Sequence, residues 1–245
     1  MPTVTELSAP YTSFMLSPRR GPAVCGVCFN LTDGGDRCWA CEHGGLFIDA
    51  VAPISYSIAG EHLHYALVAY KRAADRGTNR LAAELAAVLW RHLERHERCL
   101  ARAAGTTGFD LVTTVPSSER QRDDAHPLRR LVGRTVRPTR DRYVRLLRRS
   151  RASVRHHVFS AARYVTDTTL AGQAVLLVDD TWTTGANAQS AAAALKRAGA
   201  GPVGAVVIGR HLNRGWHRND CRLRACERPF DWTRCAHCER KGIDG

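Results

Sequence analysis

The chain has 245 residues, of which 44% are hydrophobic and 24% charged, and this composition excludes a largely disordered protein. No apolar run reaches the roughly 18 residues that a membrane-spanning helix requires, and the N-terminus does not resemble a secretion signal, so we expect a cytoplasmic protein. The 36 Lys and Arg residues outnumber the 23 Asp and Glu residues, and the net charge of +13 suits a polyanionic partner.

Arginine supplies most of the positive charge and is concentrated in one segment. Between Arg120 and Arg163 there are 14 arginines and three aspartates, which gives this segment a net charge of +11. Such a segment suits a pyrophosphorylated metabolite or a nucleic acid. A GC-rich genome would also raise the arginine content without any functional cause, so both interpretations stay open here.

Apolar patterns predict an alternation of strands and helices. Short continuous or alternating apolar runs are typical of strands, whereas apolar residues that recur every three or four positions indicate helices. The predicted strands are 51–58, 109–116, 174–180 and 203–210, and the predicted helices are 62–72, 81–103, 125–136 and 188–200, the last closed by Gly199.

This alternation is typical of the α/β class, in which a parallel sheet is flanked by helices. Small cysteine-rich modules are expected at both ends of this domain. The predicted organisation is a flexible N-terminal tail over 1–23, a four-cysteine module over 24–45, an α/β domain over 46–212 and a Cys/His-rich tail over 213–245.

The stretch from Val175 to Leu195 combines a strand, two carboxylates, a hydroxyl-rich turn and a helix. Small turn residues let the backbone approach an anion, and the unpaired N–H groups at a helix start point toward it. Neighbouring carboxylates can accept hydrogen bonds from vicinal sugar hydroxyls, so the pattern predicts a ribose-phosphate site. The carboxylates are those of Asp179 and Asp180, and the phosphate-binding residues are predicted to be Thr181, Thr183, Thr184, Gly185 and Ala186.

Other phosphate-binding motifs are excluded. No Gly-Lys-Thr or Gly-Lys-Ser follows the turn, as a P-loop would require, and no G-x-G-x-x-G follows a strand. An acidic pair with only a helix-capping role is the structural alternative for Asp179 and Asp180.

Residues 175–187 resemble the phosphoribosyl pyrophosphate (PRPP) motif of type I phosphoribosyltransferases. The C-x-x-C…C-x-x-C module and the Val115-Pro116 strand end resemble the ComF/GntX branch of that superfamily. The resemblance spans roughly residues 24 to 210. It implies a type I phosphoribosyltransferase fold, PRPP binding with Mg²⁺, and an activity that displaces pyrophosphate with an acceptor nucleophile that the motifs do not specify.

The resemblance also implies roles for individual residues. Asp179 and Asp180 would hold the ribose 2′ and 3′ hydroxyls as the catalytic pair, and the turn would hold the 5′-phosphate. The loop with Ser117 and Ser118 would correspond to the pyrophosphate loop, with Arg120 or Arg122 as its charge partner. This chain departs from the family pattern in two places, where ERQRDDAHPLRR replaces an Arg-Gly-Phe-Asn-Gln stretch and where Trp182 replaces a smaller residue.

Nine cysteines form two quartets near the chain ends, with Cys99 left over. Two C-x-x-C knuckles in the first quartet predict a closed structural zinc site, with a redox dithiol as the alternative. The looser second quartet predicts a second zinc site in which His217 or His237 could replace a cysteine. The predicted ligands are Cys25, Cys28, Cys38 and Cys41, then Cys221, Cys226, Cys235 and Cys238, and Cys99 is expected to be a buried small hydrophobic residue.

Three functions are compatible with these patterns. The first is a PRPP-dependent phosphoribosyltransferase. The second is a nucleic-acid-associated zinc protein, linked to DNA uptake, that uses the basic segment 120–163. The third is a regulator that senses PRPP or nucleotides without turnover. His156 and His157 lie in the basic segment and are expected to be solvated.

Overall fold

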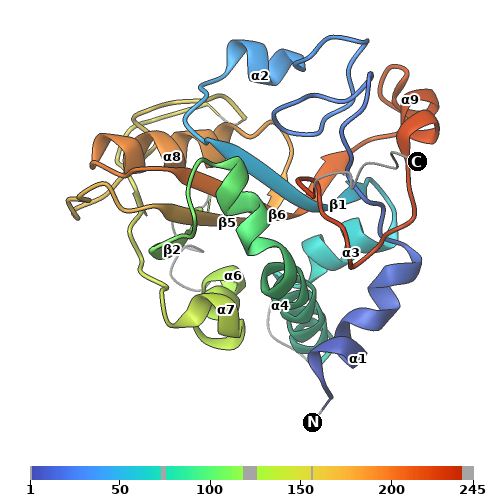
Figure 1. Ribbon diagram of the computed structural model, residues 1–245, viewed down its shortest axis with the longest axis horizontal. Helices are drawn as coiled ribbons and strands as arrows, with labels where there is room; N and C mark the ends of the chain where they lie inside the picture. The colour runs from blue at the N-terminus through green and yellow to red at the C-terminus, as the bar shows by residue number, and fades with distance from the viewer. Residues whose placement is uncertain (1, 73–75, 118–125, 156, 239–245) are drawn as a thin grey trace, which may run out of the picture.

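A four-stranded parallel sheet with strand order β1-β6-β5-β2 forms the centre of the protein (Figure 1). This computed structural model describes residues 2–72, 76–117, 126–155 and 157–238. The strands are β1 (Ala50–Ile58), β2 (Leu111–Thr114), β5 (Val175–Trp182) and β6 (Val203–Leu212). They confirm the predicted α/β class with a parallel sheet, and β5 extends two residues beyond its predicted end.

Both faces of the sheet are covered, which explains why its strands read as continuous apolar runs. Leu176 and Val178 point to a core shared with α3 (His62–Ala69) and α4 (Arg76–Ala103). Val175 and Leu177 point to the opposite core, which contains α8 (Ala186–Arg197) and the N-terminal cysteines. Figure 1 shows these layers, with α4 and α8 on opposite sides of the sheet.

Helix α8 ends through a glycine, in partial agreement with the sequence pattern. The last helical residue is Arg197, and Gly199 adopts a left-handed φ of 92° two residues later. The N–H of Ala200 donates to the carbonyl of Leu195, which closes the helix end in the manner of a Schellman motif.

Shorter elements complete the fold. A one-turn helix lies in the cysteine module, and a turn of π-helix connects two short helices within residues 127–140. These elements are α2 (Trp39–His43), α6 (Pro127–Arg130), η2 (Leu131–Thr135), α7 (Arg137–Arg140), β3 (Arg148–Arg149), β4 (Tyr164–Val165) and α9 (Asn219–Cys226).

The N-terminal segment is not the flexible tail that its prolines suggested. It forms α1 (Val4–Ser8) and the 3₁₀ helix η1 (Ala9–Ser13), and Thr3 begins α1 with a capping box that includes Glu6. Tyr11 and Met15 are 3% and 1% exposed in the core beside α4. Burial of these two side chains outweighs the tendency of the prolines to form turns. Pro10 lies in the first turn of η1, where a proline is tolerated.

Within the described residues, no helix combines the length and the apolar character needed to cross a bilayer.

Candidate functional site

The strand, turn and helix predicted at the acidic pair are present, and a glycine shapes the turn. Strand β5 ends at Trp182, and Gly185 is the N-cap of α8 with a left-handed φ of 81°. A Cβ on Gly185 would lie 2.2 Å from the Trp182 ring. The turn therefore depends on glycine both for its backbone conformation and for its close contact with the indole.

A hollow of about 60 Å³ lies over this turn. A water molecule needs about 10–15 Å³ of such a cavity, so the hollow can hold a few waters or one group the size of a phosphate. The predicted phosphate-binding residues Thr181, Thr183, Thr184, Gly185 and Ala186 all line it, together with Asp179, Trp182, Asn187, Ala188 and His157. His157 is exposed, as expected, but it also lines the hollow, a position that no sequence signal indicated.

The walls of the hollow carry hydrogen-bond donors. Within the described part of the chain, no partner is found for the backbone N–H groups of Thr183, Thr184, Gly185, Asn187 and Ala188. The predicted donor Ala186 differs, since its N–H donates to the Thr184 hydroxyl. The positive end of the α8 dipole adds to these donors, so an anion is the ligand that the hollow favours.

Asp180 is buried and engaged by side chains that the sequence reading missed. It accepts hydrogen bonds from the Tyr70 hydroxyl and, at 2.8 Å, from Lys71 Nζ. Burial opposes its ionisation, but the charge of Lys71 and these hydrogen bonds lower the pKa of Asp180. Asp180 therefore cannot simply offer a free carboxylate to a sugar. The one available signal was that Lys71 is one of only three lysines in an arginine-rich chain.

Asp179 lines the hollow and is the carboxyl group more available to a ligand. Burial, followed by the negative charge of Asp180, raises the pKa of Asp179 from 3.8 to about 8. The opposite directions of these two shifts favour one shared negative charge on the pair, with the proton on Asp179.

The raised pKa of Asp179 leads to a testable pH dependence of stability. Between 3.8 and about 8 the folded protein retains a proton that the unfolded chain has lost, so this group's contribution to stability declines as the pH rises. Asp179→Asn removes the effect. We expect it to match the wild type near pH 4 and to be more stable by about 4–6 kcal/mol at pH 9, since one pKa unit corresponds to about 1.4 kcal/mol. Urea unfolding across this range measures the difference, and Asp141→Asn, at an exposed carboxylate, is the control. A pH-independent difference would contradict the assignment.

The predicted pyrophosphate loop follows β2, which pairs with β5, so both loops lie at the carboxyl ends of adjacent strands. Val115 N–H donates to the Val178 carbonyl, and the Pro116 carbonyl accepts from Tyr164. Ser117 is the last described residue of this loop. The predicted ligands Ser118, Arg120 and Arg122 lie outside the described residues.

The first cysteine quartet converges as its spacing predicts. Ligand atoms of Cys25, Cys28, Cys38 and Cys41 all lie within 4.8 Å of one another, and all four residues are buried. The Cys28 and Cys38 sulfurs are 3.6 Å apart, far beyond the roughly 2.05 Å of a disulfide and close to the edge of a zinc tetrathiolate. The proximity of the other three thiols lowers the pKa of Cys25 below the usual thiol range. The quartet could therefore hold a structural zinc ion.

Arg210 connects this quartet to the turn between β5 and α8. The buried guanidinium donates to the Cys28 carbonyl at 3.0 Å and to the Trp182 carbonyl at 2.9 Å, and it lies 3.9 Å from the Cys28 sulfur. A tetrathiolate site around Zn²⁺ carries net negative charge, so a buried arginine beside it is electrostatically reasonable. The cysteine module is thus attached to the residue that begins the turn.

The second predicted quartet is wrong in two of its four members. Cys221 is exposed, and Cys221 and Cys226 lie on α9 outside the cluster. Cys235 and Cys238 instead lie with His96 and Cys99, all ligand atoms within 4.8 Å, so this group also could hold a metal. The prediction grouped cysteines that are near one another in sequence. In the structure, His96 and Cys99 of α4 lie beside Cys235 and Cys238 instead. Cys99 is accordingly not a simple hydrophobic residue.

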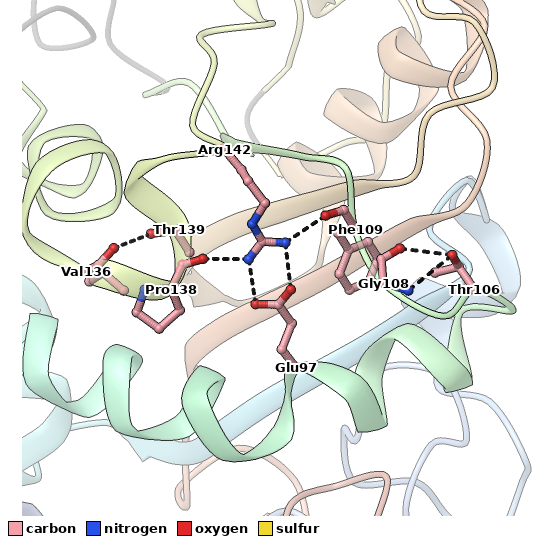
Figure 2. Close-up of polar contacts among 8 residues, drawn as sticks. All are labelled: Glu97, Thr106, Gly108, Phe109, Val136, Pro138, Thr139 and Arg142. Carbon is pink, nitrogen blue, oxygen red and sulfur yellow. Dashed lines mark hydrogen bonds and ion pairs between the residues drawn. The ribbon is translucent and has the colours of Figure 1, made fainter.

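Arginines of the basic segment serve the fold. Figure 2 shows Arg142 between the two carboxylate oxygens of Glu97 and the carbonyls of Phe109 and Pro138. Arg163 is buried and donates to the carbonyls of Arg155 and Val158, which flank His157. The positive charge of this segment is therefore not by itself an argument for nucleic-acid binding.

Comparisons of the chain with protein-family models, with curated proteins and with solved structures find no match.

Proposed function

We propose that the chain is a PRPP-binding, phosphoribosyltransferase-like protein of the ComF type, with the 5′-phosphate bound over the β5–α8 turn. The main support is the hollow at the start of α8, where backbone amides without partners and threonine hydroxyls lie next to two carboxyl groups. A phosphate and a diol within one small molecule match this pairing of donors and acceptors.

Three features of the turn favour a phosphoryl group. The amides of Thr183, Thr184 and Gly185 have no partner among the described residues, and the α8 dipole favours negative charge. The Trp182 indole N–H is buried without a partner among the described residues, and it lies 2.8 Å from where a Cβ on Gly185 would be. A buried donor of this kind directly beneath the turn adds to its positive potential.

The carboxyl groups suit the sugar. Asp179 faces the hollow and can exchange hydrogen bonds with a ribose hydroxyl, whereas Asp180 holds Lys71 at the edge of the site. In the proposed reaction, the bond from the anomeric carbon to the pyrophosphate oxygen breaks, and pyrophosphate leaves with the electron pair. The acceptor's lone pair then forms the new bond to the same carbon, and the acceptor loses a proton to solvent. The Asp179 carboxyl group orients the ribose by hydrogen bonding, because the charge of Asp180 is balanced by Lys71.

The described residues do not supply a magnesium site. Asp180 is paired with Lys71, and the groups of potential metal ligands that the described residues form consist of cysteines and one histidine. No step is therefore assigned to Mg²⁺. The first cysteine quartet is proposed to bind structural zinc, since its sulfur spacing and burial fit a closed site.

Calorimetric titration with PRPP and with ribose 5-phosphate, each with and without Mg²⁺, tests the proposed site. Thr183→Val keeps the shape of an exposed side chain that lines the hollow and removes its hydroxyl. Because a hydrogen bond to a charged group contributes about 1.5–3 kcal/mol, we expect affinity for both ligands to fall at least about tenfold.

Thr169→Val, at another exposed threonine away from the hollow, is the matched control and should bind normally. Absence of binding to the wild type, or equal weakening by both variants, would overturn the proposal. Pyrophosphate release measured over a panel of nucleobases and amines then distinguishes an enzyme from a PRPP sensor.

A further inference from the structure

The cluster of His96, Cys99, Cys235 and Cys238 joins two parts of the chain that are distant in sequence. His96 and Cys99 are three residues apart on α4, and Cys235 and Cys238 form a knuckle in the C-terminal segment. His96 and Cys238 are 142 residues apart. We propose that this cluster binds one Zn²⁺ as a Cys₃His site that fastens the C-terminal segment to α4.

The spacing of the ligand atoms fits a tetrahedral ion. The Cys238 sulfur lies 3.5 Å from the Cys235 sulfur and 3.6 Å from His96 Nδ1. Zn–S bonds of about 2.3 Å and Zn–N bonds of about 2.0–2.1 Å place tetrahedral ligand atoms about 3.5–3.8 Å apart. The sulfurs are too far apart for a disulfide. Three thiolates and one imidazole complete four-coordination, so the site is closed and structural.

Groups around the cluster orient its ligands. His96 Nε2 lies 2.9 Å from the Trp232 carbonyl, which fixes the proton on Nε2 and turns the lone pair of Nδ1 toward the sulfurs. The His237 N–H donates to the Cys235 sulfur at 3.4 Å, as in zinc knuckles. Both partners belong to the C-terminal segment, so the ligand geometry and the docking of this segment depend on each other.

The C-terminal segment has little regular structure of its own. Within the described residues it contains the eight-residue α9, whose Leu223 packs with Tyr56, and the His237 ring lies 2.8 Å from the Val51 carbonyl. Trp232 packs under Arg91 of α4 at 4.2 Å and donates to the Thr12 hydroxyl. A metal bridge between α4 and the knuckle would hold this contact, and with it the N-terminal helices.

The two cysteine sites differ in access to solvent. All four residues of the first quartet are buried, whereas Cys99 and Cys238 are only partly buried. A chelator or a thiol reagent should therefore reach the α4 site first. The chain is expected to hold two zinc ions that are released at different rates.

Metal analysis of the full chain, purified with zinc, tests the proposal. The wild type should contain about two zinc ions and Cys99→Ser about one. The matched control is Cys221→Ser/Cys226→Ser, which changes the two tail cysteines outside the cluster and should keep both ions. Retention of both ions by Cys99→Ser, or loss of one by the control, would overturn the ligand assignment.

A measurement on the wild type does not depend on the folding of a variant. Titration with a thiol reagent in the presence of a colorimetric zinc indicator should release zinc in two phases. Trypsin should cleave the C-terminal segment after the first phase, while the rest of the chain stays resistant. A single phase, or a total of one ion, would contradict the proposal.

Discussion

Replacement of Cys28 by serine is expected to remove zinc from the first quartet and to destabilise the protein by several kcal/mol. The four cysteines are part of the core on the α8 side of the sheet, where they pack with Val51 and Trp182. A serine cannot supply the fourth thiolate, and the module depends on its ion to fold. Loss of the site would also leave Arg210 as a buried cation without nearby negative charge, which adds to the cost.

We expect Cys28→Ser to lose about 3 kcal/mol or more and to lower the thermal midpoint by 10 °C or so, measured by calorimetry with metal analysis on the same sample. The control is Cys221→Ser, at an exposed cysteine of α9. Unchanged zinc content and stability in Cys28→Ser would show that the quartet is only a packed group of thiols.

The same variant has a consequence at the anion-binding turn. Arg210 bridges the carbonyls of Cys28 and Trp182, and Trp182 precedes the turn directly. Removal of the metal should loosen this bridge, so ligand affinity should fall even though Cys28 does not line the hollow. The loss of ligand affinity can be distinguished from unfolding if binding to Cys28→Ser is measured at a temperature well below the thermal midpoint of this variant.

Replacement of Gly185 by alanine is expected to have the second large effect, on both stability and binding. The new Cβ would lie 2.2 Å from the Trp182 ring, and φ at this position is 81°, where L residues are strained. The conformational cost is about 1 kcal/mol, and the clash in a packed site adds about 1–3 kcal/mol. The backbone must shift to relieve the clash, which moves the amides that line the hollow.

Gly105→Ala isolates the conformational part of this effect. Gly105 has a nearly identical φ of 80°, but no atom lies within 4 Å of its Cβ position. We expect a loss of about 1 kcal/mol for Gly105→Ala and about 2–4 kcal/mol for Gly185→Ala, measured by urea unfolding. Only Gly185→Ala should abolish binding of PRPP. Equal losses in the two variants would mean that Trp182 yields easily and that the turn is not tightly constrained.

Features formed by residues near one another in sequence were predictable. The acidic pair, the threonine-rich turn and the start of α8 lie within a dozen residues, so strand and helix periodicity was enough to place them together. The convergence of the first quartet was predictable for the same reason. Its two C-x-x-C knuckles lie close together in sequence, so the local backbone spacing is enough to bring the four sulfurs together.

Features that depend on packing between distant segments were not predictable. Tyr70 and Lys71, which directly follow α3, reach Asp180 of β5 across 110 and 109 residues of sequence, which makes Asp180 an internal ion-pair partner instead of a free ligand. The N-terminal segment was read as flexible from its prolines, although burial of Tyr11 against α4 decides its structure.

The sequence by itself therefore determined the α/β class, the turn between β5 and α8 and the convergence of the first cysteine quartet, because each follows from periodicity or spacing over a few residues. The tertiary structure decided that Asp179 and not Asp180 lines the hollow, and it placed His96 and Cys99, instead of Cys221 and Cys226, beside Cys235 and Cys238. The physical reason is that α4 and the C-terminal knuckle meet through packing on the sheet, and no local pattern encodes a contact across 142 residues.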